Sequence, residues 1–186
     1  ISVPFLYIFL VLKDDGDPSA WLKPLWGKRR SADGQSLTEG KPRVTDLVVS
    51  SGVFSKSEGA WSEEALEFLR LAASVESRSE HPLAEAIVAE AKAQGLEIAE
   101  ATDFTSVSGK GAHAKVEGRR LSIGSARLFS EQEGLDQFQE AMEKLQSEGK
   151  TAMLLADEER FLGVVAVADV LRPDAVATLK ALREAG

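Results

Sequence analysis

Two short motifs bring together residue types that suit a small-molecule pocket. The first is Ser79-Glu80-His81-Pro82, in which the imidazole of His81 offers a flat aromatic face. Glu76 lies five residues before this histidine and offers a carboxylate acceptor. The second is Ser108-Gly109-Lys110-Gly111, whose glycines let the backbone approach a ligand without a Cβ in the way. The pattern predicts a pocket made of one aromatic ring, one carboxylate and bare backbone.

Each of these residues also has a purely structural interpretation. A histidine beside a proline at the start of a helix is often a helix cap, and Glu76 and Glu80 fit the solvated ends of two helices. The glycines fit turns, as Gly118 does. Lys110 and Lys150 either attract phosphate or are merely exposed, and His113 receives no role. The residues by themselves leave both interpretations open.

A pair of helices is predicted to position the first motif. Ser62 precedes two glutamates, an N-cap followed by acidic residues in the first turn, so a helix is expected from there to about Val75. Pro82 stands where a second helix begins, and Gly95 ends it. The short connection between the two helices carries the histidine and makes them an antiparallel hairpin.

The rest of the chain reads mainly as strands. Their predicted ranges are residues 43–54, 97–107, 112–116, 119–123, 152–156 and 160–168. Glu117-Gly118 predicts a tight turn, and Ser130-Glu131-Gln132-Glu133 fits a capping box that opens a helix reaching Gly149. A last helix is expected over 174–185. The fold class is α+β, an antiparallel sheet of about six strands flanked by helix hairpins, with the helices on one side of the sheet.

The composition argues against several classes of function. The chain has 186 residues, with 30 Asp and Glu against 22 Lys and Arg, and a net charge of −8. This balance argues against a nucleic-acid partner, because binding the phosphate backbone needs a basic surface. With no cysteine and two histidines, neither a disulfide nor a metal site is expected. The apolar stretch Ile1 to Leu12 is too short to span a bilayer and is more typical of a buried strand than of a signal peptide.

From Ser36 onward the chain resembles the large cytoplasmic loop of heavy-metal-transporting, copper- or zinc-type P-type ATPases. Residues 36–42 (S-L-T-E-G-K-P) resemble the end of the phosphorylation motif of that family, and Glu76 and the two motifs above follow in the family's order. The remaining matches are Ile123-Gly124-Ser125, Gly149-Lys150-Thr151 and Asp169-Val170-Leu171-Arg172-Pro173. Together they cover about four fifths of the chain.

The resemblance implies a division of the chain. Residues 1–35 would be an unrelated N-terminal segment, 36–168 an ATP-binding N domain, and 169–186 the hinge and first helix of a truncated phosphorylation domain. Ala32 stands where the family has its phosphorylated aspartate, and the magnesium-holding segments of the family have no counterpart here. We therefore expect nucleotide binding without phosphorylation or transport, in a cytoplasmic domain.

The resemblance also assigns the site. It implies a pocket for the adenine of ATP or ADP, with or without magnesium, in which His81 stacks on the base. Glu76 would accept from the exocyclic amine, which favours adenine over guanine. Gly109, Gly111 and Gly124 would admit the rest of the nucleotide. No catalytic residue, metal ligand or membrane segment is assigned.

Two alternatives stay open. One is an interaction domain that keeps the fold without binding nucleotide and self-associates through residues 1–35. The other is a haloacid-dehalogenase-like phosphatase, for which Asp15 and Asp17 have the required spacing after an apolar stretch. The lysine and the second acidic loop that such an enzyme needs have no candidates.

Overall fold

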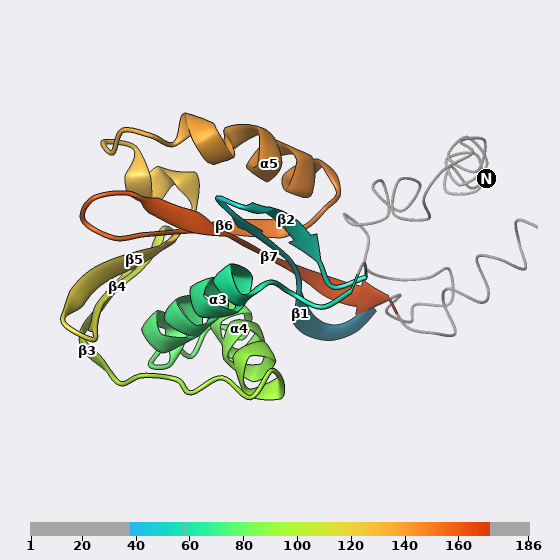
Figure 1. Cartoon of the computed structure of the whole chain (residues 1–186), viewed down its shortest axis with the longest axis horizontal. Helices are drawn as coiled ribbons and strands as arrows, with labels where there is room; N and C mark the ends of the chain where they lie inside the picture. The colour runs from blue at the N-terminus through green and yellow to red at the C-terminus, as the bar shows by residue number, and fades with distance from the viewer. Residues whose placement is uncertain (1–37, 58, 172–186) are drawn as a thin grey trace, which may run out of the picture.

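A single antiparallel sheet of seven strands forms the frame of the part of the chain that the structure describes (Figure 1). The computed structural model describes residues 38–57 and 59–171. The strands are β1 Thr38–Val49, β2 Gly52–Ser55, β3 Ala101–Val107, β4 Gly111–Val116, β5 Arg119–Gly124, β6 Thr151–Ala156 and β7 Phe161–Leu171. Their order across the sheet is β2-β1-β7-β6-β5-β4-β3. The predicted antiparallel sheet is confirmed.

The sheet has one strand more than predicted. The range 43–54, expected as one strand, contains a turn at Ser50 and Ser51, after which the chain folds back as β2. Val49 pairs with Gly52 across this turn, and the glycine adopts a φ of 146°. A left-handed φ of this kind is open to glycine and strained for other residues, so the reversal falls where Gly52 stands.

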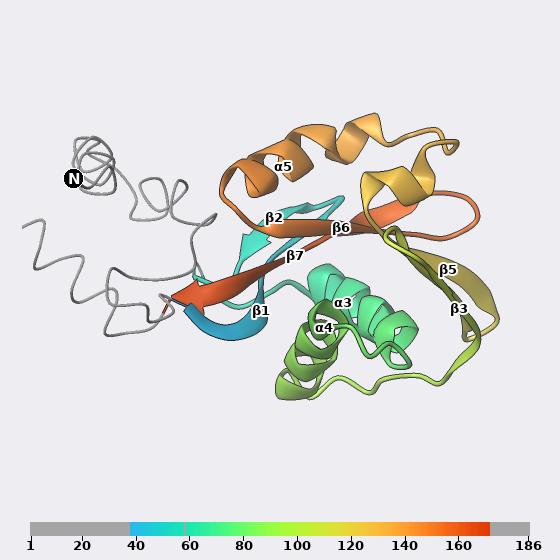
Figure 2. The ribbon, with the colours of Figure 1, turned by 180° about the vertical axis from the view of Figure 1, so that it is seen from behind.

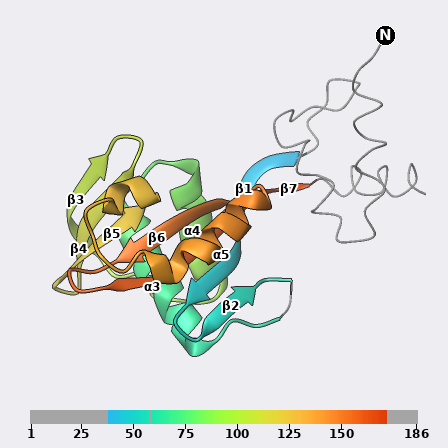
Figure 3. The same cartoon turned by 90° about the horizontal axis from the view of Figure 1, so that it is seen from above.

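Helices cover both faces of the sheet, not one. The helices of the described residues are α3 Glu63–Glu76, α4 Pro82–Ala93, the 3-10 turn η2 Ala126–Phe129 and α5 Asp136–Ser147. Figures 1 and 2 show α5 on the face opposite to α3 and α4, and Figure 3 shows this from above. Leu155 and Val165 pack in the core on the α3–α4 side, whereas Leu154 and Val164 pack in the core beneath α5. The expectation of helices on one side was wrong because β6 and β7 are apolar on both faces.

The predicted helix hairpin is confirmed, with its caps. The Ser62 hydroxyl accepts a hydrogen bond from the Ala65 amide, and Pro82 occupies the first turn of α4. Gly95 follows the end of α4 with a φ of 71°, the left-handed conformation in which glycine ends helices. The turn at Glu117 and Gly118 is also confirmed, since both residues have a positive φ between β4 and β5.

The predicted capping box at Ser130 is wrong. The residues before it form η2, where Phe129 is buried and packs edge-on against Phe161 with ring centroids 5.2 Å apart. Gly134 then takes a φ of 91°, and α5 begins only at Asp136. Burial of an aromatic ring outweighs a local capping preference worth about 1 kcal/mol.

Some predictions concern residues outside the described ranges. These are the strand at 1–12, the position Ala32, the segment 1–35 and the helix at 174–185. Within the described residues, β7 runs on through position 169 to Leu171, and Thr38 pairs with Leu171. Within the same residues, no helix has the length and apolar character needed to cross a bilayer.

Candidate functional site

The connection between α3 and α4 is a tight, hydrogen-bonded segment at the end of the helix hairpin. The Ser77 hydroxyl donates to the Ser74 carbonyl at 2.8 Å, and the Ser79 amide donates to the Glu76 carbonyl at 2.9 Å. Glu76 is the last residue of α3, and His81 is the N-cap of α4. The hairpin therefore holds the predicted carboxylate and the predicted aromatic ring at the two ends of one short segment.

Glu76 is a buried carboxylate, with 7% of its surface exposed. Burial raises the pKa of its carboxyl, while a hydrogen bond from Ser79 and the nearby charge of His81 lower it to a smaller extent. Among the described residues, no lysine or arginine forms an ion pair with it. A carboxylate buried without a cation costs free energy, and such groups occur more often at functional sites than elsewhere.

His81 caps a helix, as its structural interpretation predicts, and is also exposed, as the binding interpretation requires. Its Nδ1 accepts the Leu83 amide at 3.2 Å, so the side chain caps α4. Because Nδ1 accepts in this bond, the neutral ring carries its proton on Nε2. His81 is exposed, and its capping bond uses Nδ1 alone, so the ring face and Nε2 take no part in that bond. The cap fixes the ring without using the face that would stack on a base.

The three predicted glycines lie together, but two of them are explained by the sheet itself. Gly111 and Gly124 face each other across β4 and β5. A Cβ on Gly111 would lie 2.0 Å from the Ile123 carbonyl oxygen, and a Cβ on Gly124 would lie 2.1 Å from the Lys110 carbonyl oxygen. The backbones of the two strands therefore approach more closely than any side chain allows.

Gly109 differs from these two glycines. It occupies the turn between β3 and β4 with a φ of 68°, and a Cβ placed there would have no heavy atom within 4 Å. The turn is closed by a hydrogen bond from the Lys110 amide to the Val107 carbonyl at 3.0 Å. Its outer side is thus open, and the backbone there is accessible to a ligand.

The helix connection and the glycine turn lie toward opposite ends of β3. The Arg78 side chain, in the connection, bonds to the Ala101 carbonyl at the start of β3, and the glycine turn follows its last residue, Val107. Six residues of strand span about 20 Å. The structure therefore brings Glu76 and His81 together and brings the glycines together, with β3 running between the two groups.

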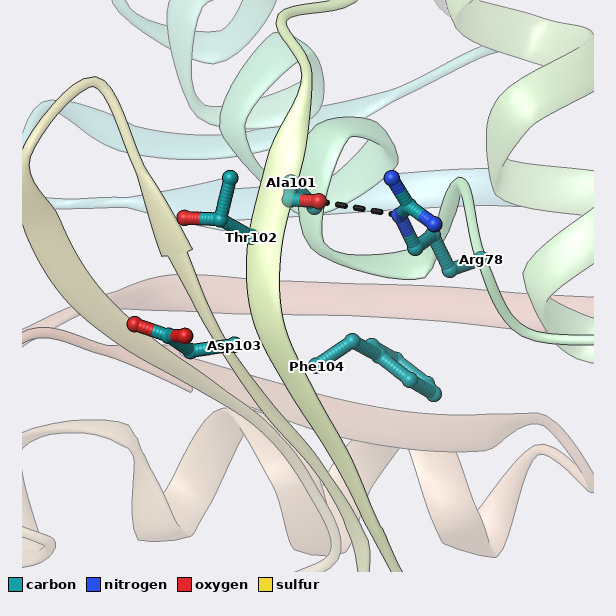
Figure 4. A pocket seen from close by; sticks show the side chains of 5 residues that line it. All are labelled: Arg78, Ala101, Thr102, Asp103 and Phe104. Atoms are coloured by element: carbon teal, nitrogen blue, oxygen red, sulfur yellow. Dashed lines mark hydrogen bonds between the residues drawn. The ribbon is translucent and has the colours of Figure 1, made fainter.

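A surface hollow that the sequence did not predict lies beside the α3–α4 connection. It has a volume of about 630 Å³, and its lining residues are Arg78, Ala101, Thr102, Asp103 and Phe104 (Figure 4). None of the five predicted site residues lines it. The pairing of β3 with β4 is irregular between Thr102 and Thr105, and Asp103 has a φ of 52°. An aspartate tolerates this conformation better than most residues, but no sequence pattern marks the irregularity.

The two lysines considered for phosphate have different settings. Lys150 forms ion pairs with Asp46 at 2.7 Å and with Glu148 at 2.8 Å. Burial lowers the pKa of the Lys150 ammonium, but its hydrogen bonds to the two carboxylates outweigh that effect and leave the pKa above its ordinary value. Lys110 is exposed beside the glycine turn. Of the two, Lys110 has the setting that suits a phosphate.

His113 and the described acidic residues offer no metal centre. His113 Nδ1 lies 2.7 Å from the Ser122 hydroxyl, on the neighbouring strand β5. Over residues 38–57 and 59–171, no three His, Asp or Glu side chains are grouped closely enough to hold a metal ion.

Comparison with known proteins shows which family has this sequence and architecture. A family model described as haloacid dehalogenase-like hydrolase matches residues 37–186. The copper-transporting P-type ATPase of Rhizobium leguminosarum bv. viciae is 37% identical over 153 residues, which are 81% of this chain and 17% of that protein. The copper-exporting P-type ATPase B of Archaeoglobus fulgidus is 39% identical over 150 residues, which are 79% of this chain and 20% of that protein.

Solved structures agree with these relatives. A zinc-transporting PIB-type ATPase in its E2.Pi state matches with a TM-score of 0.63 and 37% identity, over 79% of this chain and 23% of that chain. The N-domain of HMA6, a copper-transporting P-type ATPase, matches with a TM-score of 0.53 and 26% identity, over 69% of this chain and 100% of that domain. The chain belongs to the haloacid dehalogenase-like hydrolase family, in its heavy-metal P-type ATPase branch.

Two features of these matches bear on function. The chain spans 17% and 20% of the lengths of the two relatives named above, so it corresponds to one part of such a protein. The family match begins at residue 37, after Asp15 and Asp17. The phosphatase alternative thus named a related family. The two aspartates on which it depended lie outside the matched residues.

Proposed function

We propose that this chain binds ATP or ADP as the N domain of a heavy-metal P-type ATPase, with the adenine base held at the α3–α4 connection. The observation that carries the proposal is Glu76, a carboxylate that is 7% exposed and that no described lysine or arginine neutralises. The exocyclic amine of adenine can donate to this carboxylate, which has acceptor capacity beyond its hydrogen bond from Ser79.

The selectivity for adenine follows from the same group. Adenine carries an amine donor at the position where guanine carries a carbonyl acceptor. An ionised Glu76 accepts from the first and repels the second. His81, exposed and fixed by its bond to the Leu83 amide, supplies the face on which the base stacks.

We expect the phosphates of the nucleotide to lie toward the glycine turn at Gly109. An adenine nucleotide is elongated, with the base at one end and the charged phosphates at the other. The outer side of Gly109 is open, and Lys110 is exposed next to it. Gly111 and Gly124 support that turn by close strand packing. Magnesium, if bound, would be held by the phosphates rather than by a described cluster of protein ligands.

The assignment to the N domain draws its support from the extent of the structural match. The HMA6 N-domain is matched over its whole length. Ala32, at the position of the family's phosphorylated aspartate, makes binding without phosphoryl transfer by this chain our expectation. The proposal includes a cytoplasmic location. Self-association through residues 1–35 stays an alternative prediction, tested by sedimentation with and without that segment.

Isothermal titration calorimetry with ATP, ADP, AMP and GTP tests the proposal. We expect the adenine nucleotides to bind more tightly than GTP. Glu76→Gln should weaken ADP binding by tenfold or more, since a hydrogen bond to a charged group contributes about 1.5–3 kcal/mol. His81→Asn should weaken it to a similar extent, since stacking of a base on an aromatic ring contributes about 1–3 kcal/mol. His81→Asn keeps a capping oxygen and removes the ring, so it separates stacking from capping.

A matched control is available in the second histidine. His113→Asn removes an imidazole that lies on β4, away from the connection, and should leave the affinity for ADP unchanged. Equal binding of ATP and GTP, or ADP affinities unaffected by both site variants, would contradict the proposal.

A further inference from the structure

Arg78 joins the α3–α4 connection to the outer strand of the sheet. Its Nε donates to the Ala101 carbonyl at 2.9 Å, and its Nη2 donates to the Glu100 carboxylate at 3.3 Å. Figure 4 shows the guanidinium directed at the Ala101 carbonyl, with the Phe104 ring on the same side of β3. β3 is the last strand of the sheet, so within residues 38–57 and 59–171 its outer edge has no neighbouring strand to bond with. Arg78 supplies a donor to that region.

The helix itself does not need this bond. Ser74, one turn earlier in α3, accepts the Ala99 amide at 3.1 Å through its hydroxyl. Arg70, one turn earlier still, pairs with Glu117 in the turn between β4 and β5 at 2.8 Å. These two links already fix α3 against the β3–β5 end of the sheet. What the Arg78 bond adds is a fixed position for the segment that follows the helix.

That segment carries the proposed base site. Arg78 lies two residues after Glu76 and three before His81. The bond reaches β3 in its first, regularly paired residues, since Ala101 pairs with Val116 and Thr102 with Lys115 before the register shifts. One guanidinium therefore ties the connection to a short, registered piece of strand.

We propose that Arg78 is a positioning residue for the nucleotide, which holds the Glu76–His81 connection in its binding conformation through the Ala101 carbonyl. This inference rests on the proposed function. If the connection is held for only a fraction of the time, the apparent dissociation constant rises in inverse proportion to that fraction. Arg78 touches the strand, not the base, so its loss lowers affinity without removing a ligand contact.

Three variants of the full chain test the inference. Arg78→Ala removes the tether, and Arg78→Lys keeps the charge and one donor but not the planar guanidinium. Glu100→Gln is the matched control, because it weakens only the exposed contact to Nη2 and leaves the bond to Ala101. Each is examined by ADP calorimetry and, without nucleotide, by hydrogen exchange at the Ser79 amide, which donates to the Glu76 carbonyl.

We expect Arg78→Ala to raise both the ADP dissociation constant and the Ser79 exchange rate, each by about three- to tenfold. Arg78→Lys should recover part of both changes, and Glu100→Gln should show neither. Unchanged exchange in Arg78→Ala, or faster exchange with an affinity within twofold of the wild type, would overturn the inference and leave the proposed function standing. Failure of the wild-type chain to bind ADP would overturn both.

Discussion

Substitution of Gly111 tests whether the second glycine of the motif serves the fold or the ligand. An ideal Cβ at this position would lie 2.0 Å from the Ile123 carbonyl oxygen and 2.6 Å from the Gly124 Cα, where ordinary contact begins at 3.4 Å. In Gly111→Ala, β4 and β5 must therefore move apart by more than an ångström at this point. The neighbouring pairs of the ladder, Gly111 with Gly124 and Ala112 with Ile123, would be disrupted.

The expected cost has two parts. A left-handed backbone with a Cβ costs about 1–2 kcal/mol, and loss of two ladder hydrogen bonds costs about 1–3 kcal/mol more. Gly111→Ala should thus lower the free energy of unfolding by about 2–5 kcal/mol. Gly109→Ala is the matched control, because its φ is 68° but its Cβ would meet no heavy atom within 4 Å. Its cost should be the backbone part alone, about 1–2 kcal/mol.

Urea unfolding followed by circular dichroism measures both variants, with the slope of the transition checked against the wild type. The reasoning fails if Gly111→Ala is no less stable than Gly109→Ala. If Gly111→Ala is the less stable variant, a loss of nucleotide binding in it would reflect disruption of the sheet. Such a loss could not identify this glycine as a ligand contact.

Three further predictions concern stability. Lys150→Met should lower the free energy of unfolding by about 2–4 kcal/mol by leaving Asp46 buried without its cation, and adding Asp46→Asn should recover part of that loss in a double-mutant cycle. Burial raises the pKa of Glu76 above its ordinary value of 4.5, so the folded chain holds that proton more tightly than the unfolded chain. Its contribution to stability therefore falls as the pH rises from 4.5 through the raised pKa, and Glu76→Gln should gain on the wild type over that window in urea titrations at several pH values. His81→Ala should lose about 1 kcal/mol of stability through the Leu83 cap, while His81→Asn should lose much less; equal losses would mean that the cap contributes nothing.

The sequence predicted the elements with strong local signals. Ser62 and Pro82 mark helix starts because capping and proline geometry act over one turn, and the structure confirms both. The connection that holds Glu76 and His81 followed from those two boundaries. The sequence allowed two interpretations of His81, a helix cap or a stacking ring. In the structure His81 caps α4 through Nδ1, and this bond does not involve the face of the ring.

Features that depend on distant residues could not be predicted in this way. Leu154 and Leu155 point to opposite faces because successive strand residues alternate, but only the packing of α5 shows that both faces are covered by helices. The bond from Arg78 to Ala101 joins residues 23 positions apart, and no periodicity specifies such a contact. The requirement for glycine at 111 and 124 depends on their register across two strands, which a linear pattern of glycines does not reveal.

The central claim is that an adenine base binds at the α3–α4 connection, and the histidine spectrum tests it most directly. The chain has two histidines, so His81 and His113 give two sets of imidazole proton signals that His81→Asn assigns. On addition of millimolar ADP, we predict that the His81 signals shift with saturation while those of His113, bonded to Ser122 on the sheet, stay in place. A spectrum in which the His81 signals do not move would contradict the account.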